Sequence, residues 1–320
     1  MIKNLEIGNF KSIKNLELGC KKINLFIGGP NTGKSNILEA LGILSFNPQI
    51  KLGDLIRFER MSNLFYDEDL DDGITIRADK GIFEMCFEQG RFKGKYHKND
   101  MRPFHFDYDY DGQGGAGYSG DLPSIKFYRF AVRRDFPENV SDSLLPPFGA
   151  NLLSVIMAHK DLKKTAASIF KPYGLRIVLK PQENKIDILK IREDVLISYP
   201  YSLTSDTLQR IIFYLTAIGS NKKSVLIFEE PESNLSPHHT KHLGERIAFD
   251  ETNQYFIATH NLHLLRSILE KARKGKVAVF ITYFEDYQTK VKCITDAQLS
   301  ELTEGGYDPF FNPDSFIEED

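Results

Sequence analysis

Residues Phe26 to Leu41 read FIGGPNTGKSNILEAL, and the part from Gly28 to Ser35 matches the pattern G-x-x-x-x-G-K-[ST]. The apolar run at residues 23–27 precedes this part, as expected for a buried strand. Apolar residues at helical spacing follow it between Ile37 and Leu44. The order of strand, glycine-rich loop and helix predicts a loop whose N–H groups and helix N-terminus point at a polyanion.

The residue types in this loop suit a nucleoside triphosphate. Lys34 is predicted to reach the β- and γ-phosphates, and the hydroxyl of Ser35 is predicted to coordinate Mg²⁺. ATP and Mg²⁺ are therefore the expected cofactors. A glycine-rich turn that only caps a core helix is the alternative. The candidate nucleotide contacts are Gly28, Pro30, Asn31, Thr32, Gly33, Lys34, Ser35 and Asn36.

A second apolar run, Val225 to Phe228, stops abruptly at Glu229-Glu230-Pro231. A short, wholly apolar run is typical of a central parallel strand, and α/β sheets bind ligands at the carboxyl ends of such strands. We expect this end beside the phosphate loop, with Glu229 as metal ligand and Glu230 as the catalytic group that orients the attacking water. An acidic loop after a core strand is the alternative.

A third apolar run, at residues 255–258, ends in Thr259-His260. A lone histidine is more often a surface or core residue than a catalytic one. Its place at the end of a predicted central strand favours function, because His260 would there reach a γ-phosphate or the attacking water.

The composition is that of a folded cytoplasmic protein. The 320 residues suffice for one large domain or two intimate lobes, with 41% apolar and 27% charged residues. No apolar run approaches the ~20 residues that span a bilayer, and the start MIKNLEIGNF lacks the apolar core of a signal peptide. The three scattered cysteines indicate reduced thiols, and the net charge of -3 gives no global attraction to nucleic acid.

Taken together, these motifs resemble the ABC-type ATPase heads of the SMC, RecF and OLD proteins, a group also called AAA family ATPases. NFKS at Asn9–Ser12 is similar to the N-F-K-S element of that group, and GGPNTGKS to its Walker A motif. LIFEEPESNLSP is similar to its Walker B motif with the following D-loop, and IATHNLHLL to its histidine switch. The resemblance covers about residues 1–45 and 198–268.

The resemblance implies an α/β P-loop NTPase: a two-lobe ABC-type head with a mixed central sheet and an antiparallel N-terminal sheet. Residues 1–320 would form a single head, with core motifs in 1–45 and 198–295 and an acidic tail in 297–320. Residues 50–195 would be an insert of antiparallel strands and a helical lobe. The sequence contains no long heptad array, so we expect no coiled-coil arm like that of SMC proteins. We also expect no TOPRIM nuclease in this chain, because only about 60 residues follow His260.

Residues 200–219 occupy the place of the family signature, which contacts ATP bound to a partner subunit. Ser205 precedes an amphipathic helix predicted to end near Gly219, and its implied role is to contact that ATP in trans. Thr207, or Asp206 if the register slips by one, stands where the signature usually has glycine, and Glu229 replaces the usual aspartate. These departures imply slow turnover. The alternative is that Ser205 only caps a core helix.

The resemblance implies an ATP-binding, slowly hydrolysing enzyme that forms a homodimer or higher homo-oligomer around two ATP molecules. It would control a separate effector protein, such as a nuclease, in bacterial anti-phage defence or DNA maintenance. No membrane partner is expected. The alternative is a non-catalytic, nucleotide-gated DNA-binding module. Its binding surface would be the basic and aromatic stretch 90–102, in which Arg91, Lys93 and Lys95 alternate with Phe92 and Tyr96. A solvated edge hairpin explains this stretch equally well.

The tail at residues 297–320 contains seven acidic residues and no lysine or arginine. Phe310, Phe311 and Phe316 are spaced among these acids. This composition suits docking on a basic, apolar groove of a partner. Packing of the tail against its own domain is the competing interpretation.

Overall fold

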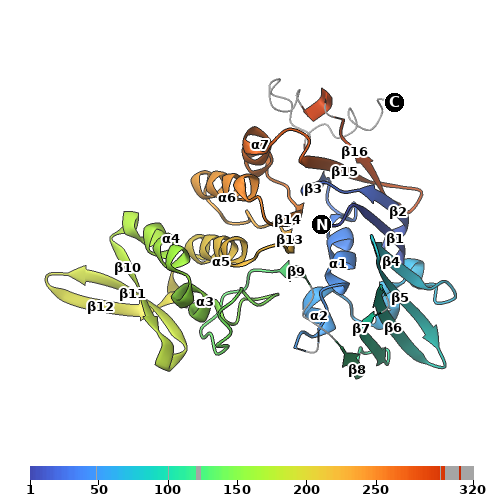
Figure 1. Ribbon diagram of the computed structural model, residues 1–320, viewed down its shortest axis with the longest axis horizontal. Coiled ribbons are helices and arrows are strands. Elements are labelled where there is room, and N and C mark those ends of the chain that lie inside the picture. Colours follow the sequence, from blue (N-terminus) through green and yellow to red (C-terminus); the bar gives the residue numbers. More distant parts are fainter. Residues whose placement is uncertain (48, 100, 120–123, 296, 300–309, 311–320) are drawn as a thin grey trace.

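The computed structural model describes residues 1–47, 49–99, 101–119, 124–295, 297–299 and 310. They form three sheets with helices between and beside them (Figure 1). This α/β architecture, with an antiparallel N-terminal sheet and a mixed central sheet, confirms the predicted fold class. The three apolar runs that carry the motifs are strands, as predicted.

The central sheet has the order β16-β15-β3-β14-β13-β9. All its neighbours pair in parallel except β15 and β16. Its strands are β3 (Ile23–Gly28), β9 (Ile125–Tyr128), β13 (Val225–Glu229), β14 (Gln254–Ala258), β15 (Val277–Glu285) and β16 (Gln288–Cys293). The parallel strands are almost wholly apolar because both faces of this sheet are covered.

The N-terminal sheet is antiparallel and has the order β2-β1-β4-β5-β6-β7-β8. Its strands are β1 (Asn4–Phe10), β2 (Ile13–Gly19), β4 (Ile74–Ala78), β5 (Gly81–Glu88), β6 (Arg91–Lys98), β7 (Met101–Tyr108) and β8 (Gly114–Tyr118). Alternate side chains of β1, such as Leu5 and Ile7, are fully buried, which is the pattern of a sheet with one face on the core.

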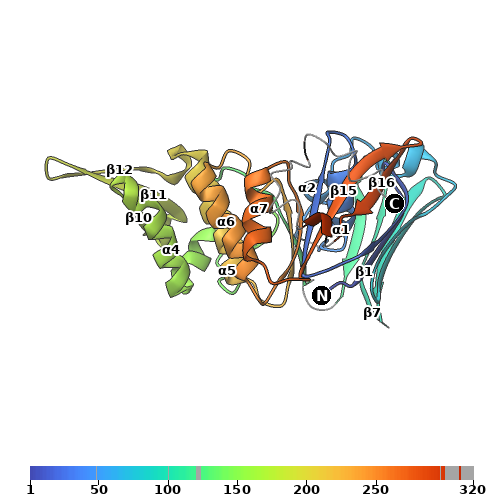
Figure 2. The ribbon, with the colours of Figure 1, turned by 90° about the horizontal axis from the view of Figure 1, so that it is seen from above.

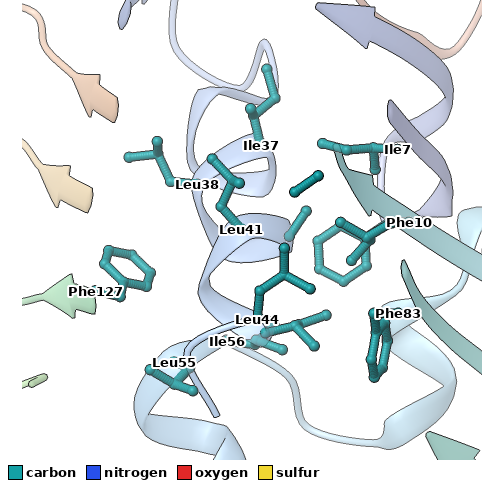
Figure 3. Packing of buried hydrophobic residues seen from close by; sticks show 14 of the residues in the cluster. Ile7, Phe10, Ile37, Leu38, Leu41, Leu44, Leu55, Ile56, Phe83 and Phe127 are labelled. Carbon is teal, nitrogen blue, oxygen red and sulfur yellow. The ribbon is translucent and has the colours of Figure 1, made fainter. Parts of the chain in front are cut away.

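Helix α1 (Lys34–Ile43) lies between these two sheets. Ile37, Leu38, Leu41 and Leu44 are fully buried, and Figure 3 shows them between Phe10 and Phe83 of the N-terminal sheet and Phe127 of β9. The phosphate loop, which runs directly into α1, is therefore anchored to a helix packed on two sides.

The other face of the central sheet is covered by helices, and a small three-stranded sheet, β10-β11-β12, lies beyond them and projects from the body (Figures 1 and 2). These elements are α3 (Leu152–Ala158), α4 (Lys160–Phe170), α5 (Asp206–Ser220), α6 (Pro237–Phe249), α7 (Leu262–Lys271), β10 (Leu175–Lys180), β11 (Lys185–Arg192) and β12 (Val195–Pro200). The shorter helices are α2 (Leu52–Leu55), η1 (Met61–Leu64), η2 (Tyr66–Glu68), η3 (Lys171–Tyr173), η4 (Pro181–Glu183) and η5 (Tyr201–Leu203).

Two features differ from the sequence-based expectations. Strand β9 comes from the expected insert but belongs to the central sheet. Helix α5 continues past Gly219 to Ser220, and a Cβ at Gly219 would lie 2.6 Å from Cδ2 of Leu162, so this glycine permits close packing of α4. Most of the acidic tail, with Phe311 and Phe316, lies outside the described residues, although Phe310 packs against the helical core.

Candidate functional site

The phosphate loop joins the end of β3 to the start of α1. Gly28 and Gly33 have φ values of 142° and 92°, a region that favours glycine. Asn31, at φ 59°, is also left-handed. A Cβ on Gly33 would lie 2.0 Å from Oγ1 of Thr289, so both the backbone and the packing require glycine there. The loop and α1 thus have the conformation that turns N–H groups toward a ligand.

Two threonines of the β15–β16 hairpin contact the phosphate loop through their hydroxyl groups. Oγ1 of Thr282 donates to the carbonyl of Ile27 at 3.1 Å and lies 2.6 Å from Oγ1 of Thr32. Oγ1 of Thr289 lies 2.7 Å from Oγ of Ser12, which accepts from the amide of Asn36. The hairpin therefore holds both ends of the loop in place.

Lys34 is buried within the loop. Its Nζ donates to the carbonyl oxygens of Gly28 and Gly29 at 3.0 and 2.6 Å. Burial lowers the pKa of Lys34 from 10.5 to about 8, and the carboxylate of Glu230 opposes this shift. At neutral pH the ammonium group remains mostly charged, and a bound phosphate would further stabilise that charge.

Glu229 ends β13, but β13 is not the direct neighbour of the loop strand as the sequence suggested. Strand β14 lies between β3 and β13, so the strand that ends before His260 is the adjacent one. The half-buried carboxylate of Glu229 lies 3.2 Å from Nη2 of Arg129 and 3.5 Å from Nη2 of Arg57. Two guanidinium groups therefore neutralise the predicted metal ligand.

The same arginines meet a second, fully buried carboxylate, Glu39 of α1. Glu39 pairs with Nε of Arg57 at 2.7 Å, with Nη2 of Arg129 at 3.1 Å and with Nζ of Lys11. We call Lys11, Glu39, Arg57, Arg129 and Glu229 the charge cluster. It connects the N-F-K-S turn, α1 and the ends of β9 and β13, and it includes Glu229, the predicted metal ligand.

Glu230 and His260 lie side by side at the ends of β13 and β14. Nε2 of His260 is 3.3 Å from Oε1 of Glu230, and both side chains are partly exposed. Burial and the nearby Lys34 lower the pKa of His260, whereas Glu230 raises it. Lys34, Glu230 and His260 thus form one electrostatic unit around the loop, with a carboxylate and an imidazole open to a ligand.

Glu232, three residues after Glu229, lies beneath this pair and is 5% exposed. Its Oε1 accepts from the hydroxyl of Thr259 and from the N–H of His260 at 3.3 Å. Its Oε2 has no hydrogen-bond partner within the described part of the chain. Burial raises the pKa of Glu232 from 4.5 to about 7, and the hydrogen bonds from Thr259 and His260 only partly offset this.

This pKa predicts a pH-dependent stability. The folded state binds the Glu232 proton more tightly than the unfolded state, so the contribution of this group is greatest below pH 4.5 and declines as the pH rises through about 7. Wild type should therefore lose on the order of 3 kcal/mol relative to Glu232→Gln between pH 5 and 8. Urea unfolding of both proteins at the two pH values measures this difference; an equal offset at both would contradict it.

Ser205 precedes α5 and is exposed at its N-terminus. Its side chain makes no capping hydrogen bond, which disagrees with the alternative that it serves only as a cap. Thr207 donates its hydroxyl to the carbonyl of Asn234, and the Asn234 amide donates to Asp206 at 3.2 Å. The start of α5 is therefore tied to the loop that carries Glu230 and Glu232.

The basic stretch expected to bind DNA has a different environment. Arg91, Lys93 and Lys95 pair with Asp107, Glu88 and Glu84 at 2.6, 3.1 and 3.2 Å. Phe92 and Tyr96 are buried in the core and offer no stacking surface to bases. Strand β6 also lies inside its sheet, between β5 and β7. The edge-hairpin interpretation is therefore wrong, and the burial of Phe92 and Tyr96 removes the aromatic part of the expected nucleic-acid grip.

The motifs missed several groups of the site. Arg129 follows the short strand β9, but Lys126 interrupts the apolar residues of that strand, so the rule that singled out Glu229 and His260 did not apply to it. Glu39 inside an apolar helical face was a weak signal. Thr282 and Thr289 have no local signal, because only their strand pairing brings them to the loop.

The donor set fits Mg-ATP. Gly28 and Gly33 lie where no Cβ fits, the Nζ of Lys34 donates to carbonyl oxygens of the loop, and Ser35 and Glu229 provide oxygen ligands of the type that Mg²⁺ prefers. Among the residues that the structure describes, no three or more His, Cys, Asp or Glu side chains are grouped so that they could hold a metal ion. None of the described helices is long and apolar enough to cross a membrane.

Two family models match the chain. Residues 1–142 match the model "AAA ATPase domain", and residues 129–266 match "AAA domain, putative AbiEii toxin, Type IV TA system". No curated protein matches.

Solved heads of SMC proteins share the fold over nearly the whole chain. An SMC head bound to the C-winged helix domain of ScpA has a TM-score of 0.57 at 13% identity and covers 94% of this chain and 99% of that one. The Pyrococcus furiosus Smc head with an extended coiled coil, bound to the C-terminal domain of ScpA, has a TM-score of 0.50 at 11% identity and covers 95% and 98%. An SMC head domain from Thermotoga maritima has a TM-score of 0.42 at 15% identity and covers 92% and 99%. The described helices of this chain include no coiled-coil arm.

Proposed function

We propose that this chain, which combines ATPase-type domain sequences with the fold of an SMC head, binds Mg-ATP and hydrolyses it slowly. The observation that carries the proposal is the convergence of Lys34, Glu230 and His260 around the glycine-rich loop. A phosphate cradle, a carboxylate and an imidazole at one sheet edge are the groups that phosphoryl transfer to water requires.

Each residue has a proposed role in binding or in chemistry. Gly28, Asn31 and Gly33 shape the loop, and the ammonium group of Lys34 exchanges its two carbonyl partners for phosphate oxygens. Ser35 and Glu229 would hold Mg²⁺, which neutralises phosphate charge when bound. Glu230 would orient a water and accept its proton, and His260 would donate from Nε2 toward a γ-phosphate oxygen or the water.

The charge cluster gives a physical reason for slow turnover. Arg57 and Arg129 already neutralise Glu229, so metal binding there has to compete with two guanidinium groups. The longer side chain of Glu229, relative to the family aspartate, and the side chain of Thr207 act in the same direction.

We further propose a homodimer that encloses two ATP molecules, with Ser205 of each copy facing the nucleotide held by the other. The exposed N-terminus of α5, which carries the positive end of the helix dipole, supports this arrangement. Leu203 beside it is 74% exposed, a large apolar side chain that a second copy would cover.

We propose that the dimer controls a separate effector protein in bacterial anti-phage defence or DNA maintenance. Two similar SMC heads were solved with ScpA domains bound, which supports a head that acts on another polypeptide. The description of the second family model, which names a toxin of a Type IV TA system, supports a defence role. The paired charges of β6 provide no support for a DNA-binding surface there.

Titration calorimetry with Mg-ATP tests the binding step. Lys34→Ala is expected to weaken affinity about 10- to 100-fold, because a charge-assisted contact to phosphate is lost. Lys163→Ala, on the exposed face of α4, is the matched control and should bind as wild type does. Absence of binding to wild type, or equal affinity in Lys34→Ala, would refute the proposal.

A further inference from the structure

The loop after β13 has a conformation that needs support. Glu230 has a φ of 43°, which is unfavourable for a residue with a side chain. Its N–H donates to the carbonyl of Ala258 at 2.9 Å, and its carbonyl accepts from the N–H of Ser233 at 3.0 Å. Outliers of this kind persist only where the surroundings hold them, and they concentrate at functional sites.

The side chains of Glu230 and His260 are not held by packing. They are 47% and 42% exposed, so the core does not select their rotamers. The hydroxyl of Ser233 donates to Oε2 of Glu230 at 3.2 Å, and the 3.3 Å approach of Glu230 to His260 also requires the right relative position of the two backbone segments that carry them, residues 229–233 and 258–260. Strand pairing ends at Glu229 and Ala258, just before both side chains.

Glu232 bridges these two segments beyond the end of the strands. Its Oε1 accepts from Thr259 and from the N–H of His260, while the carbonyl of the same residue accepts from the N–H of Leu235 at 2.9 Å. A carboxylate is an expensive group to bury, and among the described residues Oε2 of Glu232 has no hydrogen-bond partner. The free-energy cost of burying Glu232 is explained if its hydrogen bonds to Thr259 and His260 serve the pair of Glu230 and His260.

We propose that Glu232 is a positioning residue that sets the distance between Glu230 and His260 by holding the main chain of His260 through Oε1. This inference rests on the proposed function for its effect on hydrolysis, but not for its effect on the geometry of His260. Glu232 acts through the two side chains above it and does not touch nucleotide.

Two pairs of variants test the bridge. Glu232→Ala removes the acceptor, and Glu232→Gln keeps an oxygen in the same place; Thr259→Val removes the hydroxyl donor, and Thr259→Ser keeps it. We expect Glu232→Ala to lower kcat for Mg-ATP about 10- to 100-fold with KM within threefold, because small misplacements of reacting groups carry losses of this size. Thr259→Val should lose about tenfold, and the Gln and Ser variants should stay within about threefold of wild type.

Nuclear magnetic resonance titration of the His260 imidazole, assigned with His260→Asn, gives a readout without nucleotide. In Glu232→Ala the pKa of His260 should rise toward the ordinary 6.5, because the ring moves away from Lys34 and into solvent, and in Glu232→Gln it should stay low. A folded Glu232→Ala protein with unchanged kcat and unchanged His260 pKa would overturn the inference. So would a Glu232→Gln variant that loses as much activity as Glu232→Ala.

The kinetic measurements and the His260 titration distinguish a failure of this inference from a failure of the proposed function. If wild type neither binds nor hydrolyses Mg-ATP, the proposed function fails, yet the His260 titration still decides whether Glu232 positions the ring. If Glu232→Ala does not fold, Thr259→Val weakens the bridge by removing one of its two donors without emptying the buried site, and a smaller rise of the His260 pKa in the same direction is expected.

Discussion

Glu230→Gln is expected to reduce the hydrolysis of Mg-ATP about 100-fold or more, because a glutamine keeps the size of the side chain but accepts no proton from water. Nucleotide affinity should change less than threefold, since Lys34 and the loop remain intact. Phosphate release under saturating Mg-ATP measures the first effect, and calorimetry the second. Glu251→Gln, which alters an exposed carboxylate paired only with Arg273 in the described residues, is the matched control and should hydrolyse as wild type does.

The same variant tests the dimer. With hydrolysis blocked, ATP should hold two copies together, and light scattering should show twice the monomer mass at saturating nucleotide. Adding Ser205→Arg should restore the monomer, because a long side chain at the exposed start of α5 obstructs the partner nucleotide. A Glu230→Gln protein that hydrolyses normally would remove Glu230 from the mechanism, and one that stays monomeric with ATP bound would refute the dimer.

Glu39→Gln is expected to lower the free energy of unfolding by about 3–5 kcal/mol, the usual loss when one partner of a buried ion pair is removed. Glu39 is fully buried and pairs with Lys11, Arg57 and Arg129, so the variant removes the carboxylate that these three cations share. Glu229 then pairs with the two arginines alone. Urea unfolding measures the loss. The control is Glu6→Gln, whose pair with Arg77 is about half exposed, and its loss should stay below about 1 kcal/mol.

The charge cluster also couples this stability to the metal site. Without the Glu39 carboxylate, Arg57 and Arg129 should bind Glu229 more closely, so a higher Mg²⁺ concentration should be needed for half-maximal hydrolysis. A Glu39→Gln protein as stable as the Glu6→Gln control would show that the cluster contributes nothing net to folding. An unchanged Mg²⁺ requirement would show that it does not bear on the metal site.

Several parts of the site could be predicted because their causes are local. An apolar run too short for a helix and covered on both faces becomes a central strand, so residues 23–28, 225–229 and 254–258 were placed correctly. The loop between Gly28 and Lys34 followed from glycine spacing, since positive φ and lack of a Cβ are properties of single residues.

Contacts between distant segments could not be predicted in this way. The place of strand β6 inside its sheet was missed because its neighbours β5 and β7, which carry Glu84 and Asp107, meet it only through the assembly of the sheet. The register of the sheet also turns Phe92 and Tyr96 into the core. The position of β14 between β3 and β13 likewise depends on how the strands assemble and not on any one of them.

The sequence by itself therefore determined the strand, loop and helix that form the phosphate cradle, and the acidic and histidine ends of two further strands. Only the tertiary structure decided that Arg57 and Arg129 pair with both Glu39 and Glu229, and that Glu232 bridges to His260. The physical reason is the distance along the sequence over which each kind of interaction acts. Backbone conformation and burial patterns are encoded over a few residues, whereas ion pairs and buried hydrogen bonds join groups that folding alone brings within 4 Å.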